Sequence, residues 1–433
     1  METSRKIKGF FMKKVALHNL GCKVNSYEME VMQQRLTETG YEIVPFDQVA
    51  DVYVINTCSV TNIADRKSRQ MIHKAKQNNP QALVVAAGCY VQGRDSEEIH
   101  ADGVDIIVGN NKKSQIVELL DAYFEDKAKM HDAVIDINAT KEYDSMTLKK
   151  PSEHTRAFIK IQDGCNCFCS YCIIPFVRGR ERSREISDIE KEVTLLAERG
   201  CAEIVLTGIH LSSYGRDNGS SLLEVIDRVS KIEGIERIRL GSLEPQIITE
   251  EFVKALADNR KFCPHFHLSL QSGCDSVLKR MNRHYSAEDF YQITELLRKH
   301  FDDPALTTDV IVGFPGESEE EFAKTFEFLK KVKFYETHIF KYSKRAGTNA
   351  AKMQGQLTEK QKTERANVLS KLNEENKKAY IDRHVGKELE VLLEEEIVID
   401  GKTMMTGYSK EYIKCNLQTS MVAGEIAKIV YIR

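Results

Sequence analysis

The stretch GCNCFCSYCIIPFVRGRERSR, residues 164–184, carries the most specific pattern in the chain. Cys165, Cys169 and Cys172 follow one another in a C-x3-C-x2-C spacing. Three thiolates on one short loop can hold three irons of an iron–sulfur cube and leave the fourth iron open to a non-protein ligand. A structural zinc site usually needs two C-x2-C pairs, and this stretch has one such pair. A zinc loop or a chance cluster is the alternative. We interpret Cys167 as a bystander because its use would break the spacing.

Length and composition predict a multidomain cytoplasmic protein. The 433 residues suit two or three domains, at about 150 residues per domain. No apolar run approaches the roughly 20 residues of a membrane span, and no signal peptide is visible. Eleven cysteines in such a chain favour metal chemistry over disulfides. The net charge of −3 gives no global nucleic-acid signal, so any RNA contact must come from local patches. We expect a monomer with no membrane contact.

Residues 13–125 alternate between strand and helix patterns. Each of several short apolar runs leads through a turn into a helical pattern. These runs are residues 15–20, 52–55, 83–87 and 104–108. The repeat predicts an N-terminal α/β domain with a doubly wound parallel sheet.

Three cysteines fall at the ends of these predicted strands: Cys22 follows the first, Cys58 the second and Cys89 the third. The carboxyl ends of parallel strands share one edge, where ligands bind, so these distant thiols can meet. Residues that favour turns and caps flank them, namely Gly21, Asn25, Asn56, Thr57 and Gly88. We interpret the three as ligands of a second iron–sulfur cluster with an open iron. The alternative is three buried cysteines in turns, since free cysteine is a common core residue.

The middle of the chain predicts a second α/β domain. Residues 126–153 are polar and weakly periodic, which indicates a linker with one short strand at 133–137. Six βα units over residues 154–357 predict a partial (β/α)6 barrel, with ligands at the carboxyl ends of its strands. The predicted strands are 157–162, 203–207, 237–241, 265–270, 306–312 and 337–342. The predicted helices are 187–199, 222–231, 249–258, 287–300 and 319–331. The cysteine loop begins just after the first strand.

The end of the chain changes pattern. A connecting helix is expected at 358–383, with a solvated Lys and Glu surface. Short alternating runs over 384–433 predict a small five-stranded β-barrel. Its acids slightly outnumber its bases, so a grip on RNA would depend on a few placed groups such as Lys410, Tyr412 and Lys414.

The cysteine loop resembles the signature of the radical S-adenosylmethionine (radical SAM) superfamily, in which the methionine amino and carboxylate groups occupy the open iron. The whole chain resembles the methylthiotransferase family of these enzymes. The motifs that carry the resemblance are GCKVNSYE, INTCSVT, AAGCYVQ, SLEP, HLSLQSG and VIVGFPGE, together with the loop. The form GCKVNSYE is similar to the branch that modifies N6-threonylcarbamoyladenosine in tRNA. The C-terminal barrel resembles the RNA-binding TRAM domain.

The resemblance implies the cofactors and the reaction. Cys165, Cys169 and Cys172 would hold the catalytic 4Fe-4S cluster, and Cys22, Cys58 and Cys89 an auxiliary one. The expected reaction is methylthiolation of C2 of the adenine at tRNA position 37, with one SAM as radical source and a second as methyl donor. A radical removes hydrogen from an unactivated C–H bond, so no acid–base pair is required. We therefore interpret His210 and His267 as structural.

Small and polar residues after the barrel strands are the expected SAM contacts, because glycines permit close backbone approach and polar groups bind the cofactor. The predicted cofactor-binding residues are Thr207, Gly208, Ser242, Glu244, Gln271, Val312 and Arg182. Asp309 either faces the barrel lumen or belongs to a core network.

Four arginines recur at every second position behind the cysteine loop, which would place them along one face of an extended segment. Such a row can meet a phosphate backbone or the cofactor carboxylate. The glutamates that interrupt the row leave a structural ion-pair network as the alternative. The row is Arg178, Arg180, Arg182 and Arg184. The predicted substrate-binding residues are Arg178, Arg180, Lys344, Arg345 and Lys414.

The partners expected are tRNA and an electron donor such as flavodoxin or ferredoxin. Two rivals share the chemistry but differ in substrate: isopentenyladenosine in tRNA, or a ribosomal protein. A rival of another class is a non-catalytic iron–sulfur protein that binds RNA.

Overall fold

The computed structural model describes residues 13–126, 131–150 and 155–432. The chain forms two compact units. Unit 1 comprises residues 1–148 and 173–180, and unit 2 comprises residues 149–172 and 181–433. The predicted barrel and C-terminal domain thus share unit 2, whereas the short segment behind the cysteine loop joins unit 1. Part of the predicted linker, 127–130 and 151–153, lies outside the described residues, as does residue 154 at the start of the predicted barrel.

Unit 1 is built on a parallel five-stranded sheet in the order β2-β1-β3-β4-β5. Its strands are β1 (Lys14–Asn19), β2 (Glu42–Val44), β3 (Val52–Thr57), β4 (Leu83–Gly88) and β5 (Ile106–Val108). All residues of β3, β4 and β5 are buried, as expected for strands covered on both faces. The predicted doubly wound sheet is confirmed. The three-residue β2 was not predicted because it is too short to show alternation.

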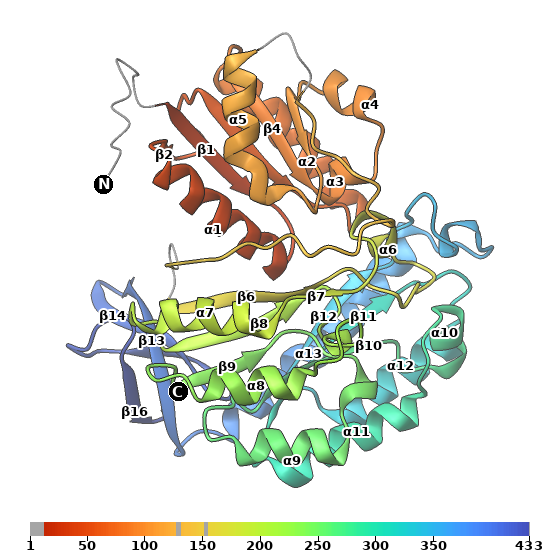
Figure 1. Cartoon of the computed structure of the whole chain (residues 1–433). Helices are drawn as coiled ribbons and strands as arrows, with labels where there is room; N and C mark the ends of the chain where they lie inside the picture. Colours follow the sequence, from red (N-terminus) through yellow and green to blue (C-terminus); the bar gives the residue numbers. More distant parts are fainter. Residues whose placement is uncertain (1–12, 127–130, 151–154, 433) are drawn as a thin grey trace. The chain divides into compact units, whose positions relative to one another are not determined.

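Helices cover both faces of this sheet (Figure 1). They are α1 (Lys23–Glu38), α2 (Asn62–Asn78), α3 (Cys89–Gln92), α4 (Ser96–Ala101) and α5 (Ile116–Glu125). The short α6 (Ile174–Val177) lies beside α3. Side chains of α2, α3 and α4 join the strand residues in one buried apolar cluster, which includes Ile72, Tyr90 and Ile99. The predicted strand at 133–137 is reduced to one parallel bridge between Val108 and Ala133.

Unit 2 contains six parallel strands in the order β6-β8-β9-β10-β11-β12, as predicted for the partial barrel. Hydrogen bonds join β6, β8 and β9 in one sheet and β10, β11 and β12 in another. An isolated bridge between Leu243 and Leu268 links the two sheets. The strands are β6 (Arg156–Asp163), β8 (Glu203–Gly208), β9 (Arg237–Leu240), β10 (His265–Gln271), β11 (Ala305–Val312) and β12 (Glu336–Lys341). A two-residue strand, β7 (Arg182–Ser183), runs antiparallel to β6.

The helices of unit 2 lie outside the barrel strands (Figure 1). They are α7 (Ile186–Ala197), α8 (Leu222–Ser230), α9 (Glu250–Asp258), α10 (Asp275–Arg280), α11 (Ala287–His300), α12 (Glu319–Val332) and α13 (Glu359–Asp382). Capping boxes at Ser286, Ser318 and Thr358 begin α11, α12 and α13, which explains the close agreement with the predicted starts. None of the described helices has the length and apolar character needed to cross a membrane.

The C-terminal part of unit 2 is an antiparallel sheet in the order β15-β14-β13-β16. Its strands are β13 (Glu388–Ile399), β14 (Lys402–Ser409), β15 (Lys414–Leu417) and β16 (Ile426–Val430). The prediction of five strands was wrong for the described residues, because the long β13 pairs with both β14 and β16. The Arg237 guanidinium donates to the Tyr408 and Glu390 carbonyls at 3.0 and 2.6 Å, which ties this sheet to the amino end of β9.

Candidate functional site

The three distant cysteines of unit 1 lie at the carboxyl ends of neighbouring strands. Cys22 follows β1 as the N-cap of α1, Cys58 follows β3, and Cys89 begins α3 directly after β4. Burial raises the pKa of the Cys58 thiol to about 11, with the nearby Cys89 and Cys22 adding to the rise. Because β1, β3 and β4 are neighbouring parallel strands, their carboxyl ends share one edge, and the three cysteines lie along that edge.

Two glycines let the chain turn tightly into this site. Gly21 and Gly88 have φ of +115° and +102°, a region that side chains rarely adopt. A Cβ on Gly88 would lie 2.6 Å from the Thr57 carbonyl oxygen, and one on Gly21 would lie 3.1 Å from the Cys58 Cβ. The backbone therefore approaches the cysteines more closely than any other residue type would allow.

Two asparagines tie the three loops together. The Asn25 side-chain amide donates to the carbonyls of Leu20 and Thr57 at 2.8 and 3.1 Å. The Asn56 amide donates to the Asn25 carbonyl at 2.9 Å. Both side chains are buried. The flanking residues that suggested turns in the sequence thus serve as cross-links between β1, β3 and the start of α1.

Arg178 points into this site and is not a surface residue. Its side chain is 0% exposed. Its Nε donates to the Cys89 Sγ at 3.4 Å, and its terminal nitrogens donate to Asn25 and Glu28. The structure therefore contradicts the prediction that Arg178 contacts RNA from an exposed row. The chain is not extended here, because α6 has Pro175 in its first turn and Arg178 at its C-cap. The helix therefore places Arg178 inside unit 1.

Sequence reasoning missed the buried charges behind Arg178. The Glu28 carboxylate accepts from Arg178 at 2.6 Å and also accepts from the Lys113 ammonium, and both Glu28 and Lys113 side chains are fully buried. Burial lowers the pKa of Lys113, an effect that Glu28 opposes. A glutamate one turn into a helix is ordinary in a sequence, so only its burial reveals this network.

These donors suit a metal cluster bound through thiolates. Cys89 Sγ accepts from Arg178 and, at 3.5 Å, from the Asn110 amide. Burial raises the pKa of Cys22, and the nearby Arg178 charge works in the opposite direction. Positive and N–H groups aimed at sulfur favour thiolate ligands and are not needed by three cysteines that merely fill turns. The residues therefore fit an iron–sulfur cluster.

The cysteine loop of unit 2 follows β6, as predicted. Its backbone is held in a compact form, in which Phe168 takes a φ of +47°. The Asn282 amide donates to the carbonyls of Cys167 and Phe168 at 3.2 and 3.1 Å, and the Ser170 hydroxyl donates to the Arg280 carbonyl at 2.7 Å. The end of α10 and the residues that follow it thus hold the loop in place.

Arg283, which sequence reasoning missed, binds this loop from the same segment. Its guanidinium donates to the Cys169 Sγ at 3.2 Å and is paired with Glu244. It also donates to the Tyr285 hydroxyl at 2.9 Å, and Tyr285 in turn donates to the Ser269 carbonyl at 2.6 Å. Arg283 thus plays the part toward Cys169 that Arg178 plays toward Cys89. Burial raises the pKa of Cys169, and the Arg283 charge and hydrogen bond work in the opposite direction. A cation aimed at sulfur suits a thiolate ligand, so this loop also fits a cluster.

Cys167 and His210, which were given no role in the site on sequence grounds, contact each other beside Cys165. The Cys167 Sγ is 3.5 Å from His210 Nε2, and His210 Nδ1 is 3.1 Å from the Glu181 carboxylate. A hydrogen bond with Cys165 lowers the pKa of Cys167 to about 4, against the effect of burial. Burial lowers the pKa of His210, but bonds to Cys167 and Glu181 outweigh it and raise that pKa to about 9.

The predicted SAM contacts lie at or near the carboxyl ends of the barrel strands, on the edge that carries the cysteine loop. They are Thr207 and Gly208 on β8, Ser242 and Glu244 after β9, Gln271 on β10, Val312 on β11 and Arg182 on β7. Their exposure differs, since Ser242 is exposed whereas Val312 and Arg182 are buried. Arg182 lies 3.9 Å from the Asp163 carboxylate.

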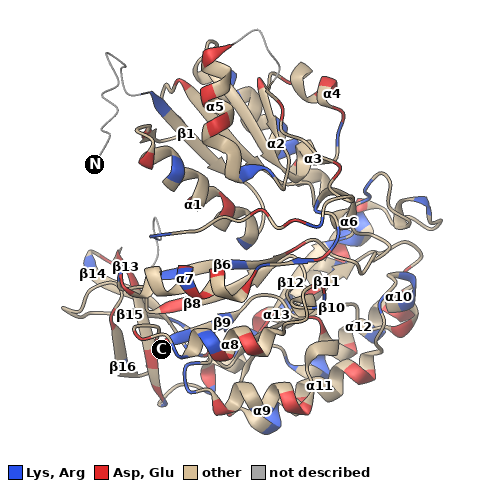
Figure 2. Ribbon diagram, viewed as in Figure 1, with Lys and Arg blue, Asp and Glu red and all other residues tan. Residues whose placement is uncertain are grey.

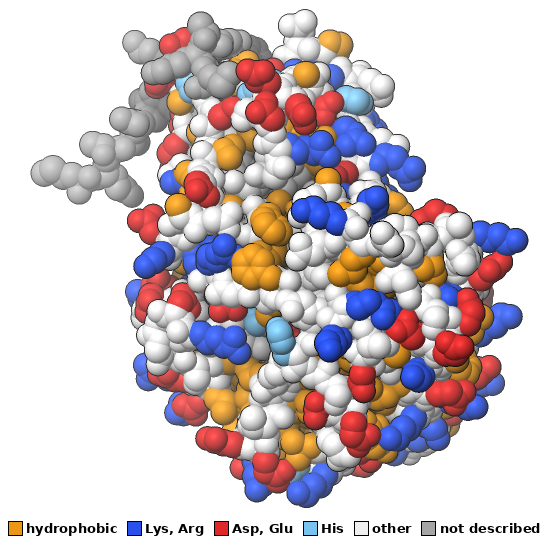
Figure 3. Space-filling model, turned by 90° about the vertical axis from the view of Figure 1, so that its right-hand side faces the viewer, with side chains coloured by type: hydrophobic (Ala, Val, Ile, Leu, Met, Phe, Trp, Pro, Cys, Tyr) orange, Lys and Arg blue, Asp and Glu red, His pale blue; other side chains and the backbone are white. Residues whose placement is uncertain are grey.

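The predicted RNA contacts do not form one row. Arg180, Lys344 and Lys414 are exposed, whereas Arg345 is buried. Arg182 and Arg184 are buried in unit 2, where Arg184 pairs with Glu192. For the buried members the ion-pair network was the better interpretation. Basic and acidic residues are interspersed along the helices (Figure 2) and over the face shown in Figure 3.

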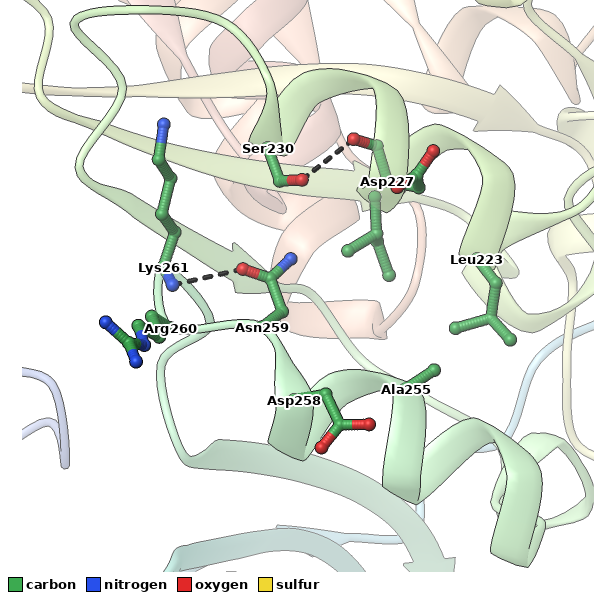
Figure 4. A pocket seen from close by; sticks show the side chains of 9 residues that line it. Leu223, Asp227, Ser230, Ala255, Asp258, Asn259, Arg260 and Lys261 are labelled. Carbon is green, nitrogen blue, oxygen red and sulfur yellow. Dashed lines mark hydrogen bonds between the residues drawn. The ribbon is translucent and has the colours of Figure 1, made fainter.

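A pocket of about 540 Å³ lies between α8 and α9, and the residues that line it come from these two helices and the loop after α9 (Figure 4). Leu223 and Asp227 line it from α8, and Ala255 from α9. The Lys261 ammonium donates to the Ile232 carbonyl at 3.1 Å. Neither a cysteine nor a predicted cofactor contact lines this pocket, so it is separate from both cysteine sites.

Known proteins resemble both halves of the chain. The family model of the radical SAM superfamily matches residues 159–329, and that of the uncharacterized protein family UPF0004 matches residues 14–109. Threonylcarbamoyladenosine tRNA methylthiotransferase MtaB of Bacillus subtilis is 42% identical over 424 residues, covering 96% of this chain and 93% of that protein. The tRNA-2-methylthio-N(6)-dimethylallyladenosine synthase of Acetivibrio thermocellus is 35% identical, covering 96% and 87%.

A solved structure shares the fold. The radical SAM methyltransferase TsrM from Kitasatospora setae, with cobalamin and a [4Fe-4S] cluster bound, has a TM-score of 0.56 at 15% identity. The match covers 76% of this chain and 72% of that chain. At this identity the likeness concerns the architecture alone, and it agrees with a parallel sheet domain combined with a radical SAM barrel.

Proposed function

The chain belongs to the radical SAM family of tRNA methylthiotransferases, and we propose that its substrate is N6-threonylcarbamoyladenosine at tRNA position 37. The proposed reaction replaces the C2–H bond of the adenine with a C2–SCH₃ bond. One SAM molecule serves as the radical source and a second as the methyl donor. The observation that carries this proposal is the 42% identity to a threonylcarbamoyladenosine enzyme along nearly the whole chain.

Members of this family use SAM and two 4Fe-4S clusters. When bound, these groups supply the electron, the organic radical and the sulfur, which is chemistry beyond the reach of protein side chains. We propose that Cys165, Cys169 and Cys172 hold the catalytic cluster. Cys22, Cys58 and Cys89 are the proposed ligands of the auxiliary one. Three protein ligands in each set leave one position for a non-protein ligand.

The remaining residues near the two sites position the cysteines and stabilise their thiolates. Arg178 and Asn110 donate to Cys89, and Arg283 donates to Cys169. Glu28 and Glu244 hold the two arginines in place. We propose that polar and small residues at the strand ends bind SAM, namely Thr207, Gly208, Ser242, Glu244, Gln271 and Val312. Arg180, Lys344 and Lys414 are the exposed residues proposed to contact the tRNA.

The choice of substrate within the family rests on sequence. The relative that acts on threonylcarbamoyladenosine is more similar than the one named for dimethylallyladenosine, with 42% against 35% identity over similar lengths. The motif GCKVNSYE at residues 21–28 points the same way. It also supplies Cys22, Asn25 and Glu28, which all belong to the auxiliary site.

The decisive experiment is mass spectrometry of tRNA nucleosides from cells that lack the gene and from the same cells with it restored. We expect the 2-methylthio derivative of threonylcarbamoyladenosine to disappear and return with the gene. A C58A chain serves as the control and should not restore it. If the methylthio derivative of isopentenyladenosine follows the gene instead, the substrate proposed here is wrong, although the family chemistry stands.

The proposal extends to the compartment, the oligomeric state and the electron donor. The enzyme would work in the cytoplasm as a monomer and receive electrons from a flavodoxin or ferredoxin. Anaerobic reconstitution followed by reduction should yield 5′-deoxyadenosine, and two 4Fe-4S centres correspond to about eight irons per chain. A fully loaded chain that releases no 5′-deoxyadenosine would instead be a non-catalytic iron–sulfur protein.

A further inference from the structure

The exposed face of α2 in unit 1 carries basic side chains and no acidic one. The single acid of this helix, Asp65, is buried. Its exposed cations are Arg66, Lys67 and Lys74. Every other described helix of eight residues or more has at least one acidic side chain that is exposed or half-buried. In a chain with a net charge of −3, α2 therefore presents an unusually positive surface.

These cations are not used by the fold in the part of the chain that the structure describes. Arg66, Lys67 and Lys74 form no ion pair with any described residue. Lys76 on the same helix shows the contrast, because its ammonium donates to the Asp105 carboxylate at 2.7 Å and to the Ala82 carbonyl at 2.9 Å. The exposed cations can therefore bind an anion from outside the chain.

The opposite face of α2 is fixed to the auxiliary cysteine site. The buried Ser68 hydroxyl accepts from the Cys58 backbone N–H at 3.3 Å and donates to the Cys58 carbonyl at 3.2 Å. The Ser59 hydroxyl donates to the Asp65 carboxylate at 2.8 Å. An α-helix with its side chains is about 10–12 Å across. The exposed cations on either side of Ser68 in sequence therefore lie about one helix diameter from Cys58.

We propose that the exposed face of α2 binds the phosphate backbone of the tRNA next to the modified adenosine. This inference rests on the proposed function, in which C2 of the adenine must receive sulfur at the auxiliary site. A nucleotide that reaches Cys58 brings the phosphates of its neighbours with it, and these phosphates need cations. The arginine row behind the cysteine loop cannot provide them, because Arg178 and Arg182 are buried.

An acidic electron-donor protein is also attracted to a basic face, but the function places RNA here. The electron that cleaves SAM is required at the cysteine loop of unit 2. The adenine, in contrast, has to come to the cysteines of unit 1, and α2 is hydrogen-bonded to one of them. The tRNA contact surface therefore extends beyond Arg180, Lys344 and Lys414 to a helix of the first sheet domain.

The test is the salt dependence of binding between the loaded chain and an anticodon stem–loop that contains threonylcarbamoyladenosine. The variant is R66Q/K67Q/K74Q, which removes three exposed cations from α2. We expect its affinity to fall about 10-fold to 100-fold at low salt. The slope of the logarithm of the binding constant against the logarithm of the salt concentration should become shallower by about 2, because each lost phosphate contact contributes about 0.7.

The matched control is K324Q/K330Q/K371Q, which removes the same charge from exposed positions on α12 and α13. Its slope should equal that of the wild type. Iron content and circular dichroism verify that each variant is loaded and folded. Equal slopes for the two triple variants would overturn the proposal, because only net charge would then matter.

A second measurement separates RNA from the electron donor. The α2 variant should form 5′-deoxyadenosine normally with flavodoxin and with dithionite when no tRNA is present. If it binds RNA as the wild type does and fails only with flavodoxin, the face serves the donor and the proposal is wrong. Because binding is measured without product, a wrong substrate assignment appears in the nucleoside analysis and leaves the salt slope unaffected.

Discussion

The two cysteine sites of this chain each bring three cysteines together, by opposite routes. In unit 1 the cysteines are separated from one another by more than 30 residues in sequence, and three strand ends bring them together. In unit 2 all three lie on one loop between Cys165 and Cys172. The first site exists only when the sheet has formed, whereas the second needs little more than a local turn. Loss of metal should therefore have different consequences in the two units.

The charged residues around the two sites also differ, because those of unit 1 are more deeply buried. Unit 1 supports its cysteines with fully buried charges, Arg178, Glu28 and Lys113. Unit 2 uses Arg283 and Glu244, which are 5% and 14% exposed at the side chain. A fully buried charge is costly unless paired, so the unit 1 network links the cysteine site to the stability of the whole sheet.

The largest effect should come from removing one ligand at each site. C169A should abolish 5′-deoxyadenosine formation, because the catalytic cluster loses a ligand. C58A should retain that activity while losing the methylthio product, and its iron content should fall from about eight to about four per chain. Iron analysis and product chromatography measure both. If C58A also loses 5′-deoxyadenosine, the two sites are not chemically separable.

The second effect concerns the buried charges of unit 1. R178M leaves Glu28 without its closest guanidinium, and breaking a buried pair costs about 3–5 kcal/mol. The matched control is R180M, two residues along and exposed, which should cost less than about 0.5 kcal/mol. Hydrogen exchange of β3 and β4 amides measures the difference within unit 1. Equal protection in both variants would show that Arg178 is not a structural part of that unit.

A smaller effect is expected for the supporting arginine of unit 2. R283K keeps the charge but loses the planar fork that reaches Cys169 and Glu244 together. The rate of 5′-deoxyadenosine formation should fall by about 10-fold to 100-fold. The control is R280K, because Arg280 pairs with Glu321 in the helical layer. An unchanged rate in R283K would remove Arg283 from the site.

The smallest effect is a pH dependence in unit 1 that leaves the cysteines untouched. His100 contacts the Asp132 carboxylate at 2.8 Å. Burial opposes its charge, but the Val104 carbonyl and Asp132 outweigh burial and raise its pKa. A raised pKa means that this contribution to stability is complete below the ordinary value near 6.5 and is lost as the pH rises through the higher folded value. Thermal unfolding of wild type and H100Q should differ most at acidic pH and converge at alkaline pH.

Features that depend on residues close together in sequence were predicted correctly, whereas the burial of the arginines, which depends on distant residues, was not. The apolar strand runs and the helical patterns are local signals, and they correctly predicted the parallel sheet, the barrel strands and the helices between them. The arginine row was wrong because period two was taken to mean one extended segment. Gly179 has a φ of +73°, and the turn there separates Arg178, buried in unit 1, from Arg182, buried in unit 2.

The sequence by itself determined the chemistry of the chain, because the cysteine spacing and the strand-end cysteines depend on residue identity and local turns. It also determined the family, which the 42% identity to a curated relative over nearly the whole chain confirms. Only the tertiary structure decided which charged groups serve the sites. Glu28, Lys113, Arg178 and Arg283 look like ordinary surface residues in one dimension, and only their burial beside sulfur reveals their roles.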